Sequence, residues 1–420
     1  MLLSMAFRRT DERRPYLFVW SRWKVMVQVM TSLQWTPSPA LRMRSVACTN
    51  SPFITERGER LDELTLAYET WGALNPRRDN AVLVFHALTG DSHAASHPEI
   101  DGDHPGWWEP VIGPGAPIDT DRHFVICANA PGSCYGSSGP ASIAPDGQPY
   151  RLRFPALTVR DLVRAQLRLV ESLGITRIQA AIGGSVGGME ALECALLAPE
   201  YVEQAIVVAA SNRFHAQGIA LNEIQRRTIM LDPSWRNGDY DPSRPPQQGL
   251  ALARMLGMVS YQCDVLMEDR FGRNPARYTQ WPEFQTRFDV EGYLHYQGDK
   301  LASRFDANSY LYLSRAMDSH DIGEGRGGLH EAAAALRASS LFVGISSDIL
   351  FPPSYVRDSA RLIQLAGGAA DYVEMNSNSG HDSFLKDFDE LATCIRPALA
   401  AHIGEGRGRE RACYQETMAD

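Results

Sequence analysis

The chain has 420 residues and a formal net charge of −9 at neutral pH, from 41 basic and 50 acidic side chains. It is long enough for a catalytic core with a second lobe, and its acidic balance disfavours a nucleic-acid-binding surface. The seven cysteines include no Cys-x-x-Cys pair, and no apolar run is long enough to cross a bilayer. We therefore expect a cytoplasmic protein that binds neither a metal ion nor a membrane.

Residues 1–50 differ from the rest of the chain because arginines are frequent in them and acidic residues are rare. Three interpretations stay open: an arginine-rich targeting peptide, a disordered extension, or a segment upstream of a true start at Met30 or Met43. We favour an extension without function, so the folded protein is expected to begin near residue 51. Residues 403–420, rich in glycine, arginine and glutamate, are expected to form a flexible tail.

Short apolar runs recur along residues 51–213 and again along 337–402. Continuous runs of this kind are typical of strands buried on both faces, as in a parallel sheet. They lie at 81–85, 124–128, 178–182, 205–210, 341–345 and 372–375. A helix is predicted to begin after Thr158, which forms an approximate capping box with Asp161, and to end at Gly174. The two segments together predict an α/β core with a mostly parallel, doubly wound sheet.

The strand pattern is interrupted between residues 214 and 336. This stretch contains proline-rich loops, a helical segment at 248–261, and many aromatic and charged residues without strand-like runs. We interpret it as a mostly helical insertion, larger than an ordinary loop and able to form a lid over a site on the core.

The sequence Gly-Gly-Ser-Val-Gly-Gly at 183–188 lies between the apolar run at 178–182 and a helical stretch at 189–197. A serine flanked by glycines in a strand-to-helix turn is typical of a nucleophile elbow. The glycines remove Cβ atoms that would collide with neighbouring elements, and the Ser185 hydroxyl lies over a helix N-terminus. The alternative is a glycine-rich turn of an ordinary doubly wound domain.

A nucleophilic serine needs a base, and the base needs an acid that orients it. Asp348 follows the run at 341–345 and His381 follows the run at 372–375, so both are expected at the sheet edge where Ser185 lies. We predict that Ser185, Asp348 and His381 form a catalytic triad. Taken singly, Asp348 could be a turn residue and His381 an ordinary core or surface histidine.

Two backbone N–H groups are candidates for an oxyanion hole. One belongs to Val186, directly after the serine, and the other to Leu88, in the loop after the run at 81–85. His86 lies at the start of the same loop. Its position at a strand exit favours a structural, loop-shaping role over that of a second base.

These features resemble the homoserine O-acetyltransferases of the α/β-hydrolase fold. The resemblance covers about residues 50 to 400, with the motifs in the expected order. It rests on His86-Ala87-Leu88-Thr89-Gly90-Asp91, Gly106-Trp107-Trp108, Gly113-Pro114-Gly115, Ile118-Asp119-Thr120-Asp121, Gly139-Pro140-Ala141-Ser142, the elbow with Met189, Leu252-Ala253-Arg254-Met255, Asp348 with Leu350-Phe351-Pro352, and Gly380-His381-Asp382.

The resemblance implies an enzyme of methionine biosynthesis that passes an acetyl group from acetyl-CoA to Ser185 and then to the hydroxyl of L-homoserine. No permanently bound cofactor is implied. Arg254 would bind the carboxylate of the amino acid and Asp382 its ammonium group, which suits their charges. Without the resemblance, Arg254 would be assigned to a surface salt bridge and Asp382 to a structural contact. The resemblance also implies a homodimer packed through the insertion.

Donor and acceptor stay open in this prediction. Glu190 stands where glutamine is usual in the family, and Val186 where methionine or leucine is usual, while the family also contains succinyl-transferring and serine-accepting members. A succinyl-CoA-dependent O-succinyltransferase of homoserine or serine is therefore the first alternative. A serine esterase is an alternative from another class, because it would use the same triad and give the acyl group to water.

Overall fold

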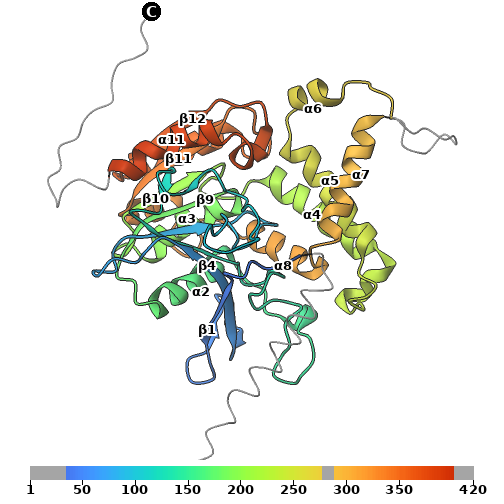
Figure 1. The fold of residues 1–420 in the computed structure, drawn as a ribbon, viewed down its shortest axis with the longest axis horizontal. Helices are drawn as coiled ribbons and strands as arrows, with labels where there is room; N and C mark the ends of the chain where they lie inside the picture. The colour runs from blue at the N-terminus through green and yellow to red at the C-terminus, as the bar shows by residue number, and fades with distance from the viewer. Residues whose placement is uncertain (1–34, 277–287, 402–420) are drawn as a thin grey trace, which may run out of the picture.

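The computed structural model describes residues 35–276 and 288–401 (Figure 1). Its centre is an eight-stranded sheet in the order β1-β4-β8-β5-β9-β10-β11-β12. Strand β4 runs antiparallel to β1 and β8, and the remaining neighbours are parallel. The strands are β1 (Arg42–Ala47), β4 (Leu64–Trp71), β5 (Ala81–Phe85), β8 (Phe124–Ala128), β9 (Ile178–Gly184), β10 (Gln204–Val208), β11 (Ser339–Ile345) and β12 (Ala370–Met375). The mostly parallel α/β fold predicted from the sequence is confirmed.

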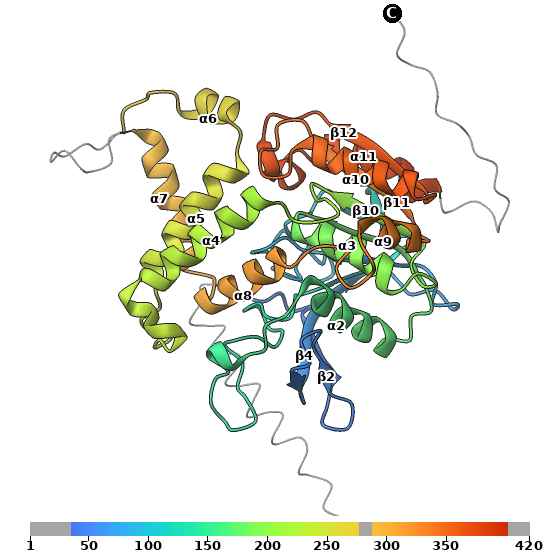
Figure 2. The same cartoon turned by 180° about the vertical axis from the view of Figure 1, so that it is seen from behind.

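Both faces of the sheet are covered, which explains the continuous apolar runs. Alternate residues of β5 enter two separate cores, with Leu83 on one side of the sheet and Val82 on the other. Helices α2 (Val159–Ser172), α3 (Val186–Leu197) and α10 (Pro353–Leu365) cover the first face. Helix α11 (Phe388–Ala401) and the segment 94–118 cover the second. Figures 1 and 2 show these layers from opposite sides.

The crossover helix before the elbow is set by its ends. The Thr158 side chain accepts a hydrogen bond from the Asp161 backbone N–H, and Asp161 bonds back to the Thr158 N–H, so the predicted capping box is present. After α2, Gly174 adopts a φ of 70°, which glycine tolerates without strain. This helix therefore begins and ends where the sequence predicted.

The predicted start of the folded core near residue 51 is wrong. Strand β1 pairs antiparallel with β4, and Trp35 donates from its indole Nε1 to Asp91 at 3.0 Å and packs on the Tyr135 ring at 4.9 Å. Strand β1 escaped prediction because it lies at the sheet edge with a mostly exposed, arginine-containing sequence rather than a continuous apolar run. Met43 lies within β1; residues 1–34, including Met30, and the expected tail at 403–420 lie outside the described residues.

The segment between β10 and β11 carries helices where an insertion was expected. They are α4 (Ala216–Leu231), the 3-10 helix η2 (Pro233–Gly238), α5 (Gln247–Tyr261), α6 (Asp264–Phe271), α7 (Asp289–Ala302), α8 (Ala307–Asp318) and α9 (Leu329–Ala335). Helices α4 to α7 form a lobe beside the core in both views (Figures 1 and 2). A buried ion pair, Arg226 with Asp318 at 2.7 Å, joins α4 to α8. Within the described residues, no helix has both the length and the apolar character needed to cross a membrane.

Candidate active site

Ser185 occupies a strained turn between β9 and α3. Its φ of 60° and ψ of −125° are rare for a residue with a side chain. The turn is held from outside, since the Ser185 N–H donates to the Val208 carbonyl of β10 at 3.0 Å. A serine whose backbone is held in such a conformation by its surroundings is typical of nucleophile elbows.

Glycines make this turn possible because β5 approaches it closely. A Cβ atom on Gly187 would lie 2.3 Å from the Phe85 carbonyl oxygen, and one on Gly183 would lie 2.5 Å from the backbone of Gly187. Both contacts are with backbone atoms that have no freedom to move aside. The flanking glycines are thus required by packing, as the sequence predicted.

His381 and Asp348 form a buried pair. His381 Nδ1 donates to Asp348 Oδ2 at 2.7 Å, and the other carboxylate oxygen accepts from the backbone N–H groups of Leu350 and Phe351, both at 2.8 Å. Burial opposes protonation of His381, but the neighbouring Asp348 carboxylate outweighs it and raises the pKa of the imidazole. The pair therefore has the geometry of a base with its orienting acid.

The second ring nitrogen of His381, Nε2, is available to accept a proton. Among the described residues, His381 Nε2 is buried and has no hydrogen-bond partner. The imidazole stacks on Phe351 at 5.3 Å and meets the Phe384 ring at 5.7 Å. Phe384 in turn packs on Gly184, where an added Cβ would lie 2.4 Å from the ring. One aromatic side chain thus contacts both His381 and the residue preceding Ser185, which brings the base beside the elbow.

A cavity opens directly on Ser185. Leu88 and Leu350 line it from the loops after β5 and β11, and the insertion contributes most of the remaining wall. Its lining residues are Leu88, Ser185, Leu221, Asn222, Gln225, Ser260, Tyr261, Met317 and Leu350. The insertion therefore covers Ser185, as expected for the lid predicted from the sequence.

Of the two expected oxyanion donors, one belongs to a residue of the cavity wall and the other to the residue directly after Ser185. Val186 is the first residue of α3, where backbone N–H groups are not used within the helix, and Leu88 lines the cavity itself. His86 is buried between loops, with Nδ1 at 2.8 Å from the Ala87 carbonyl and Nε2 accepting from the Ala130 N–H at 2.9 Å. Since both nitrogens are engaged with backbone, His86 has the loop-shaping role that was predicted.

Arg254 and Asp382 lie next to the cavity without lining it. The Arg254 guanidinium lies 5.5 Å from the centre of the Tyr261 ring, and within the described parts of the chain it pairs with no carboxylate. Asp382 Oδ2 accepts from Gln262 Nε2 at 3.2 Å and pairs with Lys386 at 3.3 Å. Arg254 thus has a charge available for a ligand, whereas Asp382 would have to share its charge.

Tyr261 is the residue that sequence reasoning missed. Its ring lines the cavity, contacts the His381 ring at 5.9 Å and lies under Arg254. The polar residues Asn222, Gln225 and Ser260 of the cavity wall were also missed. Nothing in the local sequence distinguishes them from other helix residues, because their position depends on how the insertion folds over the core.

Glu190, the departure noted in the sequence, is buried in α3 behind the elbow. Burial raises its pKa to about 8, although a hydrogen bond of 2.6 Å from Gln166 Nε2 favours the charged form. Burial therefore favours the protonated, neutral form of Glu190. This is the state in which it most resembles glutamine.

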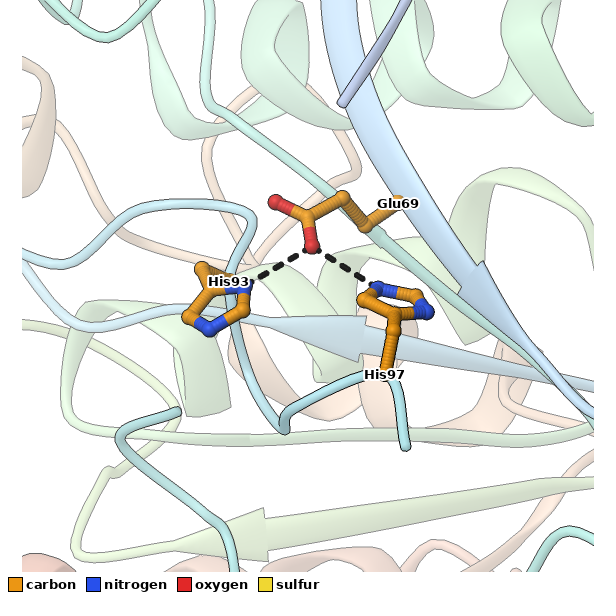
Figure 3. A group of neighbouring side chains, drawn as sticks. All are labelled: Glu69, His93 and His97. Atoms are coloured by element: carbon orange, nitrogen blue, oxygen red, sulfur yellow. Dashed lines mark hydrogen bonds and ion pairs between the residues drawn. The ribbon is translucent and has the colours of Figure 1, made fainter. Parts of the chain in front are cut away.

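Glu69, His93 and His97 are the side chains best arranged to hold a metal ion in the described part of the chain (Figure 3). The donor types suit zinc or a related ion. However, Glu69 Oε2 already bonds to His93 Nδ1 at 2.8 Å and to His97 Nε2 at 3.0 Å, and His93 Nε2 donates to the His104 carbonyl at 2.7 Å. Because these groups satisfy one another, we assign the cluster to a buried ion pair that fastens the segment 93–104 to β4.

The charge state of this cluster follows from its contacts. Burial disfavours a charged His93, but the hydrogen bond with Glu69 outweighs it and raises the pKa of His93 to about 9. Burial also disfavours a charged Glu69, yet hydrogen bonds from both histidines lower its pKa overall. The ion pair is thus charged at neutral pH.

The pH dependence of stability provides a test of this ion pair. Below the ordinary histidine pKa of about 6.5, His93 is charged in both the folded and unfolded chains, and the stabilisation is complete. Between about 6.5 and 9 only the folded chain keeps the proton, so the free energy of unfolding should fall by on the order of 1 kcal/mol per pH unit. Glu69→Gln should remove this fall in urea unfolding measured across the range, whereas Glu374→Gln, in an exposed pair, should not. A constant difference between wild type and Glu69→Gln at every pH would contradict the assignment.

Comparisons with known proteins point to one family. A family model described as alpha/beta hydrolase fold matches residues 80–388. The homoserine O-acetyltransferase of Symbiobacterium thermophilum is 51% identical over 361 residues, which cover 85% of this chain and 94% of that protein. That of Moorella thermoacetica is 48% identical over 345 residues, covering 82% of this chain and 92% of the relative.

Solved structures of two enzymes share the fold of this chain. The homoserine O-acetyltransferase from Bacillus anthracis superposes with a TM-score of 0.80 at 29% identity, covering 86% of this chain and 97% of that one. Esterase E22 superposes with a TM-score of 0.77 at 30% identity, covering 86% of this chain and 100% of that one. The chain belongs to the homoserine O-acetyltransferase family of the α/β-hydrolase fold.

Proposed function

We propose that this chain transfers an acetyl group from acetyl-CoA to the hydroxyl of L-homoserine through an ester on Ser185. The observation that carries the proposal is the buried His381–Asp348 pair, whose imidazole contacts the ring of Tyr261 in the wall of the cavity that Ser185 lines. The similarity to the enzyme of Symbiobacterium thermophilum supports the choice of substrates. Acyl-CoA thioesters are intracellular metabolites, so the proposal includes a cytoplasmic location.

In the first half-reaction, Ser185 Oγ attacks the thioester carbonyl while His381 Nε2 takes its proton. The negative charge on the carbonyl oxygen is stabilised by the N–H groups of Leu88 and Val186. The C–S bond then breaks, His381 returns the proton to the departing thiolate, and Ser185 carries the acetyl group. Asp348 keeps the proton of the neutral imidazole on Nδ1, which leaves Nε2 as the base.

In the second half-reaction, the homoserine hydroxyl gives its proton to His381 and attacks the Ser185 ester. The bond between Ser185 Oγ and the acetyl carbon then breaks, and His381 returns the proton to Ser185 Oγ. Arg254 binds the amino-acid carboxylate, and Asp382 binds the ammonium group. The Arg254 guanidinium above the Tyr261 ring, which pairs with no carboxylate of the described residues, supports this orientation. The roof formed by the insertion keeps water from competing with homoserine for the ester.

Hydrolysis to acetate is the second candidate, because esterase E22 shares 30% identity and the same fold. The two functions differ in what attacks the Ser185 ester. A hydrolase needs only water, whereas the transferase needs a site that orients an amino acid. The free charge of Arg254 beside the cavity favours transfer.

The first test is a grid of acetyl-CoA and succinyl-CoA, each with L-homoserine and L-serine. We expect acetyl-CoA with homoserine to give the highest kcat/KM and an O-acetylated product identified by mass spectrometry. Ser185→Ala should lower this rate by about a thousandfold or more and abolish the acetylated protein. Release of free CoA without homoserine, at the rate of the complete reaction, would instead establish a hydrolase.

Arg254→Met tests the orientation of the acceptor. Losing a charge-assisted contact to the carboxylate should raise the KM for homoserine roughly 10- to 100-fold, while acetylation of Ser185 by acetyl-CoA in the absence of acceptor keeps its rate. Arg273→Met, which removes an exposed arginine stacked on Phe288, serves as the matched control. An unchanged KM for homoserine would exclude Arg254 from acceptor binding.

We also propose that two copies of the chain associate through the insertion. The support is a set of large apolar side chains exposed on α4 and α5, including Leu231 at 72% and Leu252 at 51% exposure. Sedimentation of the purified protein should give the mass of a dimer. Leu231→Glu combined with Leu252→Glu should shift it to a monomer, and Leu365→Glu, at 71% exposure on α10, should leave it dimeric. A monomeric wild type would refute the proposal.

A further inference from the structure

The turn that carries one oxyanion donor is a short, defined structure. It follows β5 and is closed by the Gly90 N–H, which donates to the Ala87 carbonyl at 2.8 Å. Leu88 and Thr89 are its central residues, and Leu88 lines the cavity together with Ser185. The direction of the Leu88 N–H therefore depends on how firmly the peptide planes of this turn are held.

His86 holds one side of the turn. Because its Nε2 accepts from the Ala130 N–H, its proton lies on Nδ1, which donates to the Ala87 carbonyl. This bond fixes the peptide plane that ends in the Leu88 N–H, and it ties the turn to the loop after β8. The other side of the turn is the Thr89 carbonyl, to which His86 makes no hydrogen bond in the described part of the chain.

Arg304 holds that other side. It lies between α7 and α8 of the insertion, and its Nη1 donates to the Thr89 carbonyl at 3.0 Å and also to the Tyr135 hydroxyl. In the described part of the chain, no carboxylate pairs with this guanidinium. Its charge is thus directed at a backbone carbonyl, which makes the contact stronger than one from a neutral donor.

The Tyr135 ring, on which Arg304 lies, is held in place by packing. Tyr135 is completely buried, and its ring contacts Phe305 at 5.4 Å and Trp35 at 4.9 Å. The Arg304 guanidinium lies 5.9 Å from the centre of this ring. The donor is therefore fixed by packing on its far side as well as by its hydrogen bonds.

We propose that Arg304 is a positioning residue for acylation of Ser185: by holding the Thr89 carbonyl, it fixes the turn that presents the Leu88 N–H to the oxyanion. The inference rests on the proposed function only for the identity of the nucleophile and of the oxyanion donors. Because Arg304 belongs to the insertion, its bond to Thr89 also links the fold of the insertion to the acylation of Ser185. Arg304 itself touches neither substrate nor reacting atoms.

The test follows acetylation of Ser185 in Arg304→Ala, with acetyl-CoA and with a chromogenic acetyl ester. We expect the acylation rate to fall about 10- to 100-fold, with the KM for homoserine unchanged. Millimolar guanidinium should restore part of the rate in a saturable manner, because it can occupy the space left by the side chain. Arg304→Lys should retain an intermediate rate. Arg315→Ala, an exposed arginine on α8, serves as the control and should behave as wild type.

Two results would overturn the proposal. One is an unchanged acylation rate in Arg304→Ala; the other is a slow, folded variant that does not respond to guanidinium and has a raised KM for homoserine. If Arg304→Ala fails to fold, Arg304→Lys and Tyr135→Phe carry the same test, since each weakens the hold on Thr89 without emptying the site. A wild type that accepts the chromogenic ester but does not acetylate homoserine would refute the proposed function and leave this inference standing.

Discussion

The structure depends on one strained residue. Ser185 holds a backbone conformation that costs on the order of 1–3 kcal/mol, and it persists because the surrounding elements leave no alternative. The carbonyl of Phe85 on β5 presses against Gly187 from one side, and the Val208 carbonyl accepts the Ser185 N–H from the other. Ser185 is therefore fixed by two neighbouring strands, and its position is decided by the sheet rather than by the turn alone.

The acid and base reach the same point from strands that follow much later in the chain. Asp348 leaves β11 and is fixed by two backbone N–H groups of its own loop, while His381 lies in the short helix η3 (Gly380–Leu385) after β12. Phe384 of that helix packs on Gly184. A parallel sheet brings all of these loops to one edge, and aromatic packing sets the final distance between them. The insertion then covers Ser185 and brings the Arg254 guanidinium next to the cavity.

Sequence reasoning worked where the physical cause was local or periodic. The elbow glycines, the capping box at Thr158 and the six apolar runs are all visible in short stretches of sequence. The run at 372–375 differs from the others because it lies in the edge strand β12 and is only partly buried. Strands β1 and β4 were missed, because β1 is half exposed and β4 carries Glu69 within it, so neither forms a continuous apolar run. Arg254 and Asp382 were identified only through the family resemblance. Tyr261 was missed altogether, because its place depends on the fold of the insertion over the core.

The ion pair between Arg226 and Asp318 also stabilises the wall of the cavity. Both side chains are buried, so separating α4 from α8 would break an ion pair that is screened from solvent, at a cost of several kcal/mol. Both helices belong to the cavity wall, α4 through Leu221, Asn222 and Gln225 and α8 through Met317. We therefore expect any widening of the cavity to displace the two helices together, as one rigid unit.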